Sequence, residues 1–85
     1  MSHHPTDFQG SVEDAIASSI KTQLPDAVVQ VSGSGGHYNI DVVSSAFAGK
    51  SMLHNQRLVL SAIKHLINGA APPVHAVDTL KTRTP

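Results

Sequence analysis

The sequence HYNIDVVS at residues 37–44 decides the fold. Apolar and polar residues alternate along it, which is the pattern of a strand with one buried and one exposed face. Directly before it, GSGG at residues 33–36 supplies glycines that can adopt the positive φ angles of a tight turn. A short β-branched stretch at residues 27–32 precedes the glycines. The sequence therefore predicts a β-hairpin whose core-facing residues in the second strand are Tyr38, Ile40 and Val42.

Helical periodicity appears on both sides of this hairpin. Ser11 opens a sequence that resembles a capping box, and apolar residues at helical spacing predict a helix to about Gln23. A second amphipathic pattern predicts a longer helix from about Asn55, ended by Asn68 and Gly69. Between hairpin and helix, residues 45–51 are expected to form a bend with a short helical turn. After it, residues 74–81 predict a third strand.

These elements predict an α+β fold in the order α-β-β-α-α-β. The hairpin strands should pair antiparallel, and the third strand, reached through a helical crossover, should pair parallel with one of them. The result would be a two-layer sandwich, with a three-stranded mixed sheet and the helices on one face. We expect a single domain over residues 11–85, preceded by a flexible segment, residues 1–10, in which His3 and His4 lie on the surface.

Composition excludes several classes of function. Six basic and six acidic residues balance, so the chain lacks the overall positive charge of a strongly basic nucleic-acid module. Cysteine is absent, so this chain alone cannot form disulfides, thiol nucleophiles or an all-thiolate iron–sulfur site. No run approaches the ~20 apolar residues that span a bilayer. We therefore expect no membrane association and a reduced compartment, the cytoplasm, with an organelle such as the mitochondrion as the alternative.

Catalytic and nucleotide-binding motifs are also missing. The glycines at residues 33–36 lie between two strands and do not lead into a helix N-terminus, as a phosphate-binding loop would. Gly49-Lys50-Ser51 resembles the end of a P-loop, but the earlier glycine of that motif is replaced by Ser44. No G-x-S-x-G sequence presents a nucleophilic serine. These observations favour a protein that is not an enzyme.

Six histidines are the compositional excess of this chain. His54 and His65 are interpreted as surface residues at the start and near the end of the long helix. His37 and His75 each begin a predicted strand after a glycine-rich or proline-rich connection. Two hypotheses remain for this pair: hydrogen bonding to nearby backbone, or ligation of a transition metal by neutral imidazole. Two histidines alone do not complete a site of about four ligands.

An ordered set of short motifs resembles the BolA family over about residues 11–85. The matching segments are VSGSGGHYNIDVVS at 31–44, FAGK at 47–50, RLV at 57–59, VHAV at 74–77 and TRTP at 82–85. The resemblance implies an α-β-β-α-α-β fold similar to a class II KH domain. Asn55-Gln56-Arg57 stands where many members have R-H-R, which places the chain closest to the YrbA/IbaG-type subgroup.

The resemblance also implies a function. It implies partnership with a monothiol glutaredoxin and its glutathione, in which a bridging [2Fe–2S] cluster serves iron–sulfur assembly or iron regulation. His75 matches the family's histidine ligand. The second ligand of the family lies in the hairpin loop, where this chain has Ser34, and His37 is the imidazole near enough to substitute. Isolated protein is expected to hold no cluster and to be a monomer or weak homodimer.

The alternative implied by the resemblance is a DNA-binding transcriptional regulator that uses a helix-turn-helix-like surface. Its candidate phosphate contacts are Lys50, Arg57 and Lys64. The competing interpretation is that these three cations are ordinary exposed residues of a neutral protein.

Overall fold

The computed structural model describes residues 11–85. The flexible segment expected at residues 1–10 lies outside the described residues. In chain order the elements are α1 (Val12–Gln23), β1 (Val28–Ser34), β2 (His37–Val43), the 3-10 helix η1 (Ser45–Phe47), α2 (Met52–Ala62), α3 (Lys64–Ile67) and β3 (Ala76–Arg83). This sequence of elements confirms the predicted α-β-β-α-α-β order, with η1 as the short helical turn.

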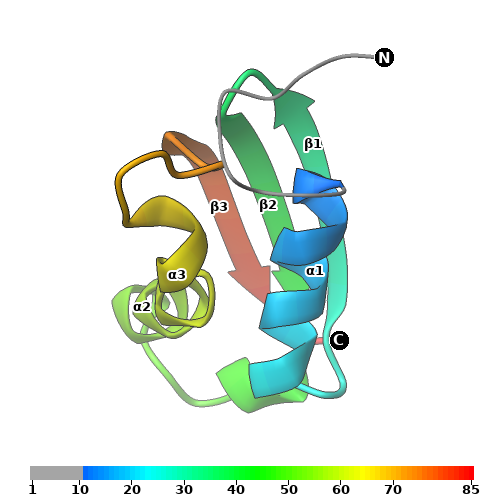
Figure 1. The fold of residues 1–85 in the computed structure, drawn as a ribbon. Coiled ribbons are helices and arrows are strands. Elements are labelled where there is room, and N and C mark those ends of the chain that lie inside the picture. The colour runs from blue at the N-terminus through cyan, green and yellow to red at the C-terminus, as the bar shows by residue number, and fades with distance from the viewer. Residues whose placement is uncertain (1–10) are drawn as a thin grey trace.

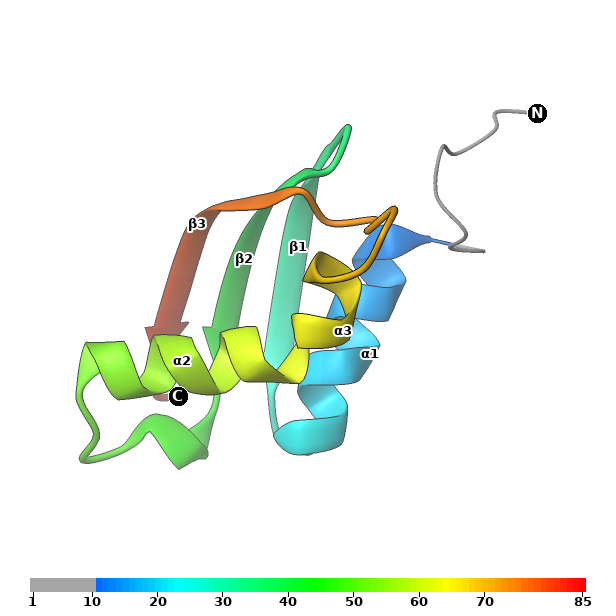
Figure 2. The same cartoon turned by 60° about the vertical axis from the view of Figure 1, so that its left-hand side comes forward.

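The three strands form one mixed sheet in the spatial order β1-β2-β3. β1 and β2 pair antiparallel, and β2 and β3 pair parallel after the helical crossover. Figures 1 and 2 show the three α-helices gathered on one side of this sheet. The architecture is the predicted two-layer α+β sandwich, and within residues 11–85 no helix covers the other face of the sheet.

The core lies between the two layers. β2 follows the predicted alternation, because Tyr38, Ile40 and Val42 are buried while the residues between them are not. Helical spacing buries Ile16 and Ile20 of α1 against this face. The remaining buried apolar side chains come from the connections and the second helical segment: Leu24, Ala27, Phe47, Val59, Ala62, Ile63, Leu66 and Val74. Burial of these side chains is the main favourable term that holds helices and sheet together.

The Asp26 carboxylate links the turn between α1 and β1 to the connection between β2 and η1. The Ser44 hydroxyl donates to Asp26 Oδ1 at 2.7 Å, and the Ser45 hydroxyl and backbone N–H donate to Oδ2 at 2.6 and 2.9 Å. Hydrogen bonds stabilise the charged form of a carboxyl group. The bond from the Ser45 hydroxyl has the largest effect and that from the Ser44 hydroxyl the next largest, and they lower the pKa of Asp26 to about 2. Asp26 thereby fixes the α1–β1 turn to the start of η1.

The long helix differs from its prediction at both ends. α2 begins at Met52, earlier than the predicted Asn55, because the Ser51 hydroxyl accepts the His54 N–H at 3.1 Å and caps the first turn. The helix is then interrupted at Ile63, whose N–H donates to the Leu60 carbonyl three residues earlier at 3.2 Å. Such three-residue bonds tighten the turn, and a separate α3 follows.

Strand boundaries also differ from the predicted ones. β1 extends through Ser34, so the hairpin turn consists of Gly35 and Gly36, whose φ angles of 62° and 85° suit a tight two-residue turn. β3 begins at Ala76 and not at the predicted residue 74. Val74 is fully buried, and its N–H donates to the Leu66 carbonyl at 3.0 Å, which ties it to α3 instead of the sheet.

Replacement of Asp26 by asparagine should lower the free energy of unfolding in a pH-dependent way. The carboxylate contributes its full stabilisation above the unfolded-state pKa of about 3.9 and loses it as the pH falls towards the folded-state value of about 2. Urea unfolding should therefore show a less stable Asp26→Asn variant at neutral pH, with the difference shrinking towards pH 2. A difference of equal size at both pH values would contradict this role of the charge.

Candidate functional site

The hairpin turn and the entry to β3 are held together by one carbonyl group. Gly36 O accepts the backbone N–H of His75 at 2.7 Å and that of Ala76 at 3.0 Å. A Cβ atom built on Gly36 would lie 2.6 Å from both Cγ and Nδ1 of His75. The imidazole therefore packs directly against this glycine, in space that any other side chain would fill. His75 as a residue is nevertheless exposed.

His37 lies beside this position at the start of β2. Its Cα partner across the parallel pairing is Ala76, the residue after His75, so the two histidines begin adjacent strands at the same end of the sheet. His75 was predicted to lie at the start of the third strand, within residues 74–81, but it precedes β3 by one residue. Its main chain is held by the Gly36 carbonyl instead of by a regular strand ladder.

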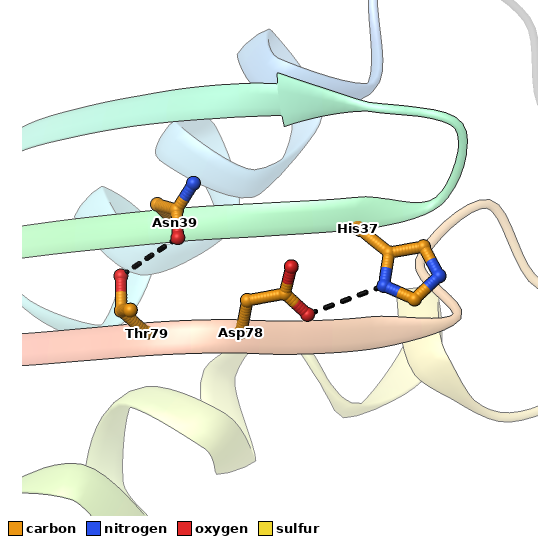
Figure 3. Close-up of polar contacts among 4 residues, drawn as sticks. All are labelled: His37, Asn39, Asp78 and Thr79. Carbon is orange, nitrogen blue, oxygen red and sulfur yellow. Dashed lines mark hydrogen bonds and ion pairs between the residues drawn. The ribbon is translucent and has the colours of Figure 1, made fainter.

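A β-bulge brings a carboxylate to His37. The pairing of β2 with β3 shifts between Tyr38 and Asn39, so that Val77 and Thr79 have partners and Asp78 is the extra residue. A bulge redirects a side chain that strict alternation would place on the other face. Figure 3 shows the result, with Asp78 Oδ1 reaching across to His37 Nδ1 at 3.2 Å. Both side chains remain more than half exposed, at 58% for His37 and 51% for Asp78.

This contact has a chemical consequence for the imidazole. A carboxylate next to Nδ1 favours the tautomer with its proton on that nitrogen, which leaves the lone pair on Nε2. Histidines that ligate metals commonly donate their second ring N–H to a carboxylate in this way. The Thr79 hydroxyl donates to Asn39 Oδ1 at 2.9 Å one step along the strands, and it bridges the same two strands beyond the bulge.

The donor set of this region is incomplete for a resident metal. Over residues 11–85, no cluster of three or more His, Cys, Asp or Glu side chains is placed to hold a metal ion. His37 and His75 would supply two nitrogen ligands, and a site of about four ligands would need the others from a second molecule.

The structure places two of the three candidate nucleic-acid contacts in one groove and the third outside it. Arg57 and Lys64 line one groove along α2 and α3, together with the apolar side chains of Leu60 and Ile67. Lys50 lies in the turn between η1 and α2, where its N–H donates to the Phe47 carbonyl at 3.3 Å. The structure thus brings two of the three predicted residues together.

The remaining histidines of the described chain stand apart from this site. His54 is exposed on the first turn of α2. His65 Nε2 lies 3.2 Å from the Ser19 hydroxyl, a hydrogen bond between α3 and α1 that the sequence did not indicate. Asp78 was also missed, because only the bulge brings it to the face of His37. No helix within residues 11–85 combines the length and apolarity needed to cross a membrane.

Comparison with known proteins gives consistent matches. The family described as BolA-like protein matches residues 9–85. The chain is 34% identical over 86 residues to human BolA-like protein 1, and the alignment covers 89% of this chain and 60% of that relative's length. It is also similar to the crystal structure of a Bol-like protein from Babesia bovis, with a TM-score of 0.73, 34% identity and 91% coverage of each chain.

A second solved structure supports the same likeness. The solution structure of BolA1 from Mus musculus gives a TM-score of 0.71 at 29% identity, covering 100% of this chain and 74% of the mouse chain. The α-β-β-α-α-β order and the mixed three-stranded sheet described above match these structures.

Replacing Gly36 with alanine should destabilise the protein and displace the His75 ring. Its φ of 85° is in the left-handed region, which costs a residue with a side chain about 1–3 kcal/mol, and the new Cβ would overlap the imidazole. Urea unfolding and the NMR resonances of the imidazole measure the two effects. Gly35→Ala is the matched control, because Gly35 has a φ of 62° but nothing within 4 Å. Equal displacement of the His75 resonances in both variants would contradict the direct packing.

Proposed function

This chain belongs to the BolA-like protein family, and from that membership we propose that it is a non-enzymatic partner of a monothiol glutaredoxin. The two proteins would share a bridging [2Fe–2S] cluster, with glutathione as part of the glutaredoxin's contribution. The shared cluster would serve iron–sulfur assembly and trafficking or iron regulation. The observation that carries the proposal is the exposed His75 ring, held against Gly36 at the end of the sheet.

The position of His75 suits a ligand that must meet another protein. The bonds from His75 and Ala76 N–H to Gly36 O fix the backbone, so little conformational freedom would be lost when the ring binds. Glycine at position 36 leaves space for the ring without burying it. The absence of cysteine in the chain is consistent with this arrangement, since the thiolates would come from the partner.

His37 is the proposed second ligand. Ser34, which stands at the hairpin position corresponding to the family's second ligand, pairs with His37 across the turn, and a serine hydroxyl is a poor ligand for iron. The Asp78 carboxylate on Nδ1 would present Nε2 of His37 as the ligating atom. His37 and His75 would then hold the cluster from this side, while the isolated protein would carry none.

When bound, the cluster would supply one-electron redox chemistry, at a higher potential than an all-cysteine cluster because imidazole replaces thiolate on iron. Binding would also depend on pH, because a protonated imidazole has no lone pair for iron. The role of this chain would be to keep the two rings oriented and accessible.

Subgroup, assembly and location are part of the same proposal. Among the motifs, Asn55-Gln56-Arg57 supports assignment to the YrbA/IbaG-type subgroup. In the structure, the side-chain amide of Gln56 donates to the Leu80 carbonyl at 3.3 Å. Alone, the protein is proposed to be a monomer or weak homodimer. The proposed compartment is the cytoplasm, with the mitochondrion as the alternative.

DNA binding is the weaker candidate. A regulator that reads DNA needs several cations along the phosphate backbone. Lys50 does not line the groove of Arg57 and Lys64, and that groove has apolar side chains between its two cations. Cluster sharing requires none of these three residues.

His75→Ala should abolish the spectral change that the wild-type protein produces on mixing with a cluster-loaded monothiol glutaredoxin. The alanine removes the nitrogen ligand but no core side chain, so thermal unfolding should stay close to wild type. Visible absorption and circular dichroism under anaerobic conditions provide the measurement. His54→Ala, an exposed histidine on α2, is the control and should keep the wild-type spectra. Unchanged spectra in His75→Ala would remove this residue from the mechanism.

His37→Ala should also alter the visible absorption and circular dichroism spectra of the mixture with cluster-loaded glutaredoxin. Asp78→Ala should weaken cluster sharing without removing a ligand. Loss of a carboxylate partner of a metal-bound histidine typically costs about 10- to 100-fold in metal affinity. Titration of each variant with cluster-loaded glutaredoxin measures this loss. Thr79→Ala, which breaks the neighbouring bond to Asn39, is the control that leaves the imidazole in place. An Asp78→Ala titration identical to wild type would show that the carboxylate does not orient His37.

A further inference from the structure

The neutral net charge of the chain conceals a separation of charges along the sequence. Residues 42–77 contain Lys50, Arg57 and Lys64 and no aspartate or glutamate, so this segment has a formal charge of +3. The rest of the chain contains all six acidic residues and three basic ones, for a formal charge of −3. α2 and α3 lie entirely within the basic segment. Any charge attraction that these helices exert is therefore directed at acidic partners.

A groove on the two helices combines this charge with apolar surface. Arg57, Leu60, Ser61, Lys64, Ile67 and Asn68 line it, and we name it the α2–α3 groove. They come from the second half of α2, from α3 and from the residue after it, so the groove lies where the two helices meet. Leu60 is 37% exposed although it is a large apolar residue, and Ile67 is half-buried. Figure 2 shows α3 turning away from the axis of α2 after the break between the two helices.

The apolar surface continues beyond the groove towards the start of α2. Leu53, one heptad before Leu60, is 56% exposed, and its neighbour Met52 is 71% exposed. Leu53, Leu60 and Ile67 are thus spaced seven residues apart, with Arg57 and Lys64 between them. Exposed apolar side chains with charges beside them are typical of a protein-binding surface.

The two cations of the groove are available for a partner. Across residues 11–85 the ion pairs are those of His37 with Asp78 and of Arg83 with Asp41, so neither Arg57 nor Lys64 is paired there. A docked carboxylate would therefore gain its attraction without breaking an existing ion pair in this part of the chain. Charge complementarity of this kind selects the partner and orients it.

We propose that the α2–α3 groove binds an acidic amphipathic helix of a partner protein. Apolar side chains of that helix would cover Leu60 and Ile67, and its carboxylates would pair with Arg57 and Lys64. A phosphate backbone fits this surface less well, because phosphates offer no apolar surface to cover Leu60 and Ile67. The groove belongs to the helical layer, whereas His37 and Asp78 lie on the sheet, so the groove is distinct from the candidate ligand site.

The test uses the full chain, labelled with ¹⁵N, and three probes. The first is a blocked peptide of about 16 residues, long enough for some helicity, with leucines at every third or fourth position and glutamates beside them. The second replaces its glutamates by lysines, and the third is duplex DNA. The glutamate peptide should shift the amide resonances of Arg57, Leu60, Lys64 and Ile67, and the lysine peptide should not.

Variants of the chain separate charge from apolar contact. Arg57→Glu and Lys64→Glu should each weaken binding of the glutamate peptide about threefold to tenfold at low salt. Reversal of the charge turns an attraction into a repulsion. Leu60→Ser should weaken it as well, which a purely electrostatic contact would not show. Lys21→Glu, an exposed cation on α1, is the matched control and should bind as the wild type does.

Three results would overturn the proposal. The first is the absence of shifts at millimolar glutamate peptide. The second is binding that survives Leu60→Ser and both charge reversals. The third is a DNA duplex that shifts the groove resonances while the peptide does not, which would assign the groove to nucleic acid. None of these outcomes depends on whether His75 binds a cluster.

Discussion

The carbonyl oxygen of Gly36 joins two parts of the chain that are far apart in sequence. By accepting the N–H groups of His75 and Ala76, it sets the point at which β3 begins to pair with β2. The first pairs, His37 with Ala76 and Tyr38 with Val77, follow from this start, and the bulge after Tyr38 then leaves Asp78 beside His37. The glycine itself is required, because its lack of a side chain admits the His75 ring. The turn, the register and the two imidazoles therefore form one connected arrangement.

The one-sided sandwich separates the surfaces available to partners. Burying one face of the sheet beneath the helices leaves polar residues of β2 and β3 on the other face, including Asn39 and Thr79. The helical layer has its own outer side, where Arg57 and Lys64 lie beside exposed leucines. The two surfaces are thus built from different layers of the fold.

Much of the fold and part of the site could be predicted from the sequence. Burial of one face causes the alternation in residues 37–44 and the helical spacing around Ile16 and Val59. The order of the elements, the two layers and the core residues were therefore predictable. The break in the helix at Ile63 was not predictable, because no proline or glycine, the usual causes of a break, occurs there. Asp78 was missed for a similar reason: a bulge is a property of the pairing between strands, and strict alternation gives no sign of it.

The parallel pairing of β2 with β3 also determines when the candidate ligands come together during folding. The β1–β2 hairpin closes over a two-residue turn, whereas β3 can pair only after the chain from residue 44 to residue 75 has been brought back to the sheet. Closing the longer loop costs more chain entropy, so local contacts form more readily than this distant one. The contact between His75 and Gly36 therefore costs more chain entropy than closure of the hairpin, and it requires β3 to have returned to the sheet. An incompletely folded chain does not present both imidazoles, and a partner that needs both would engage only the finished molecule.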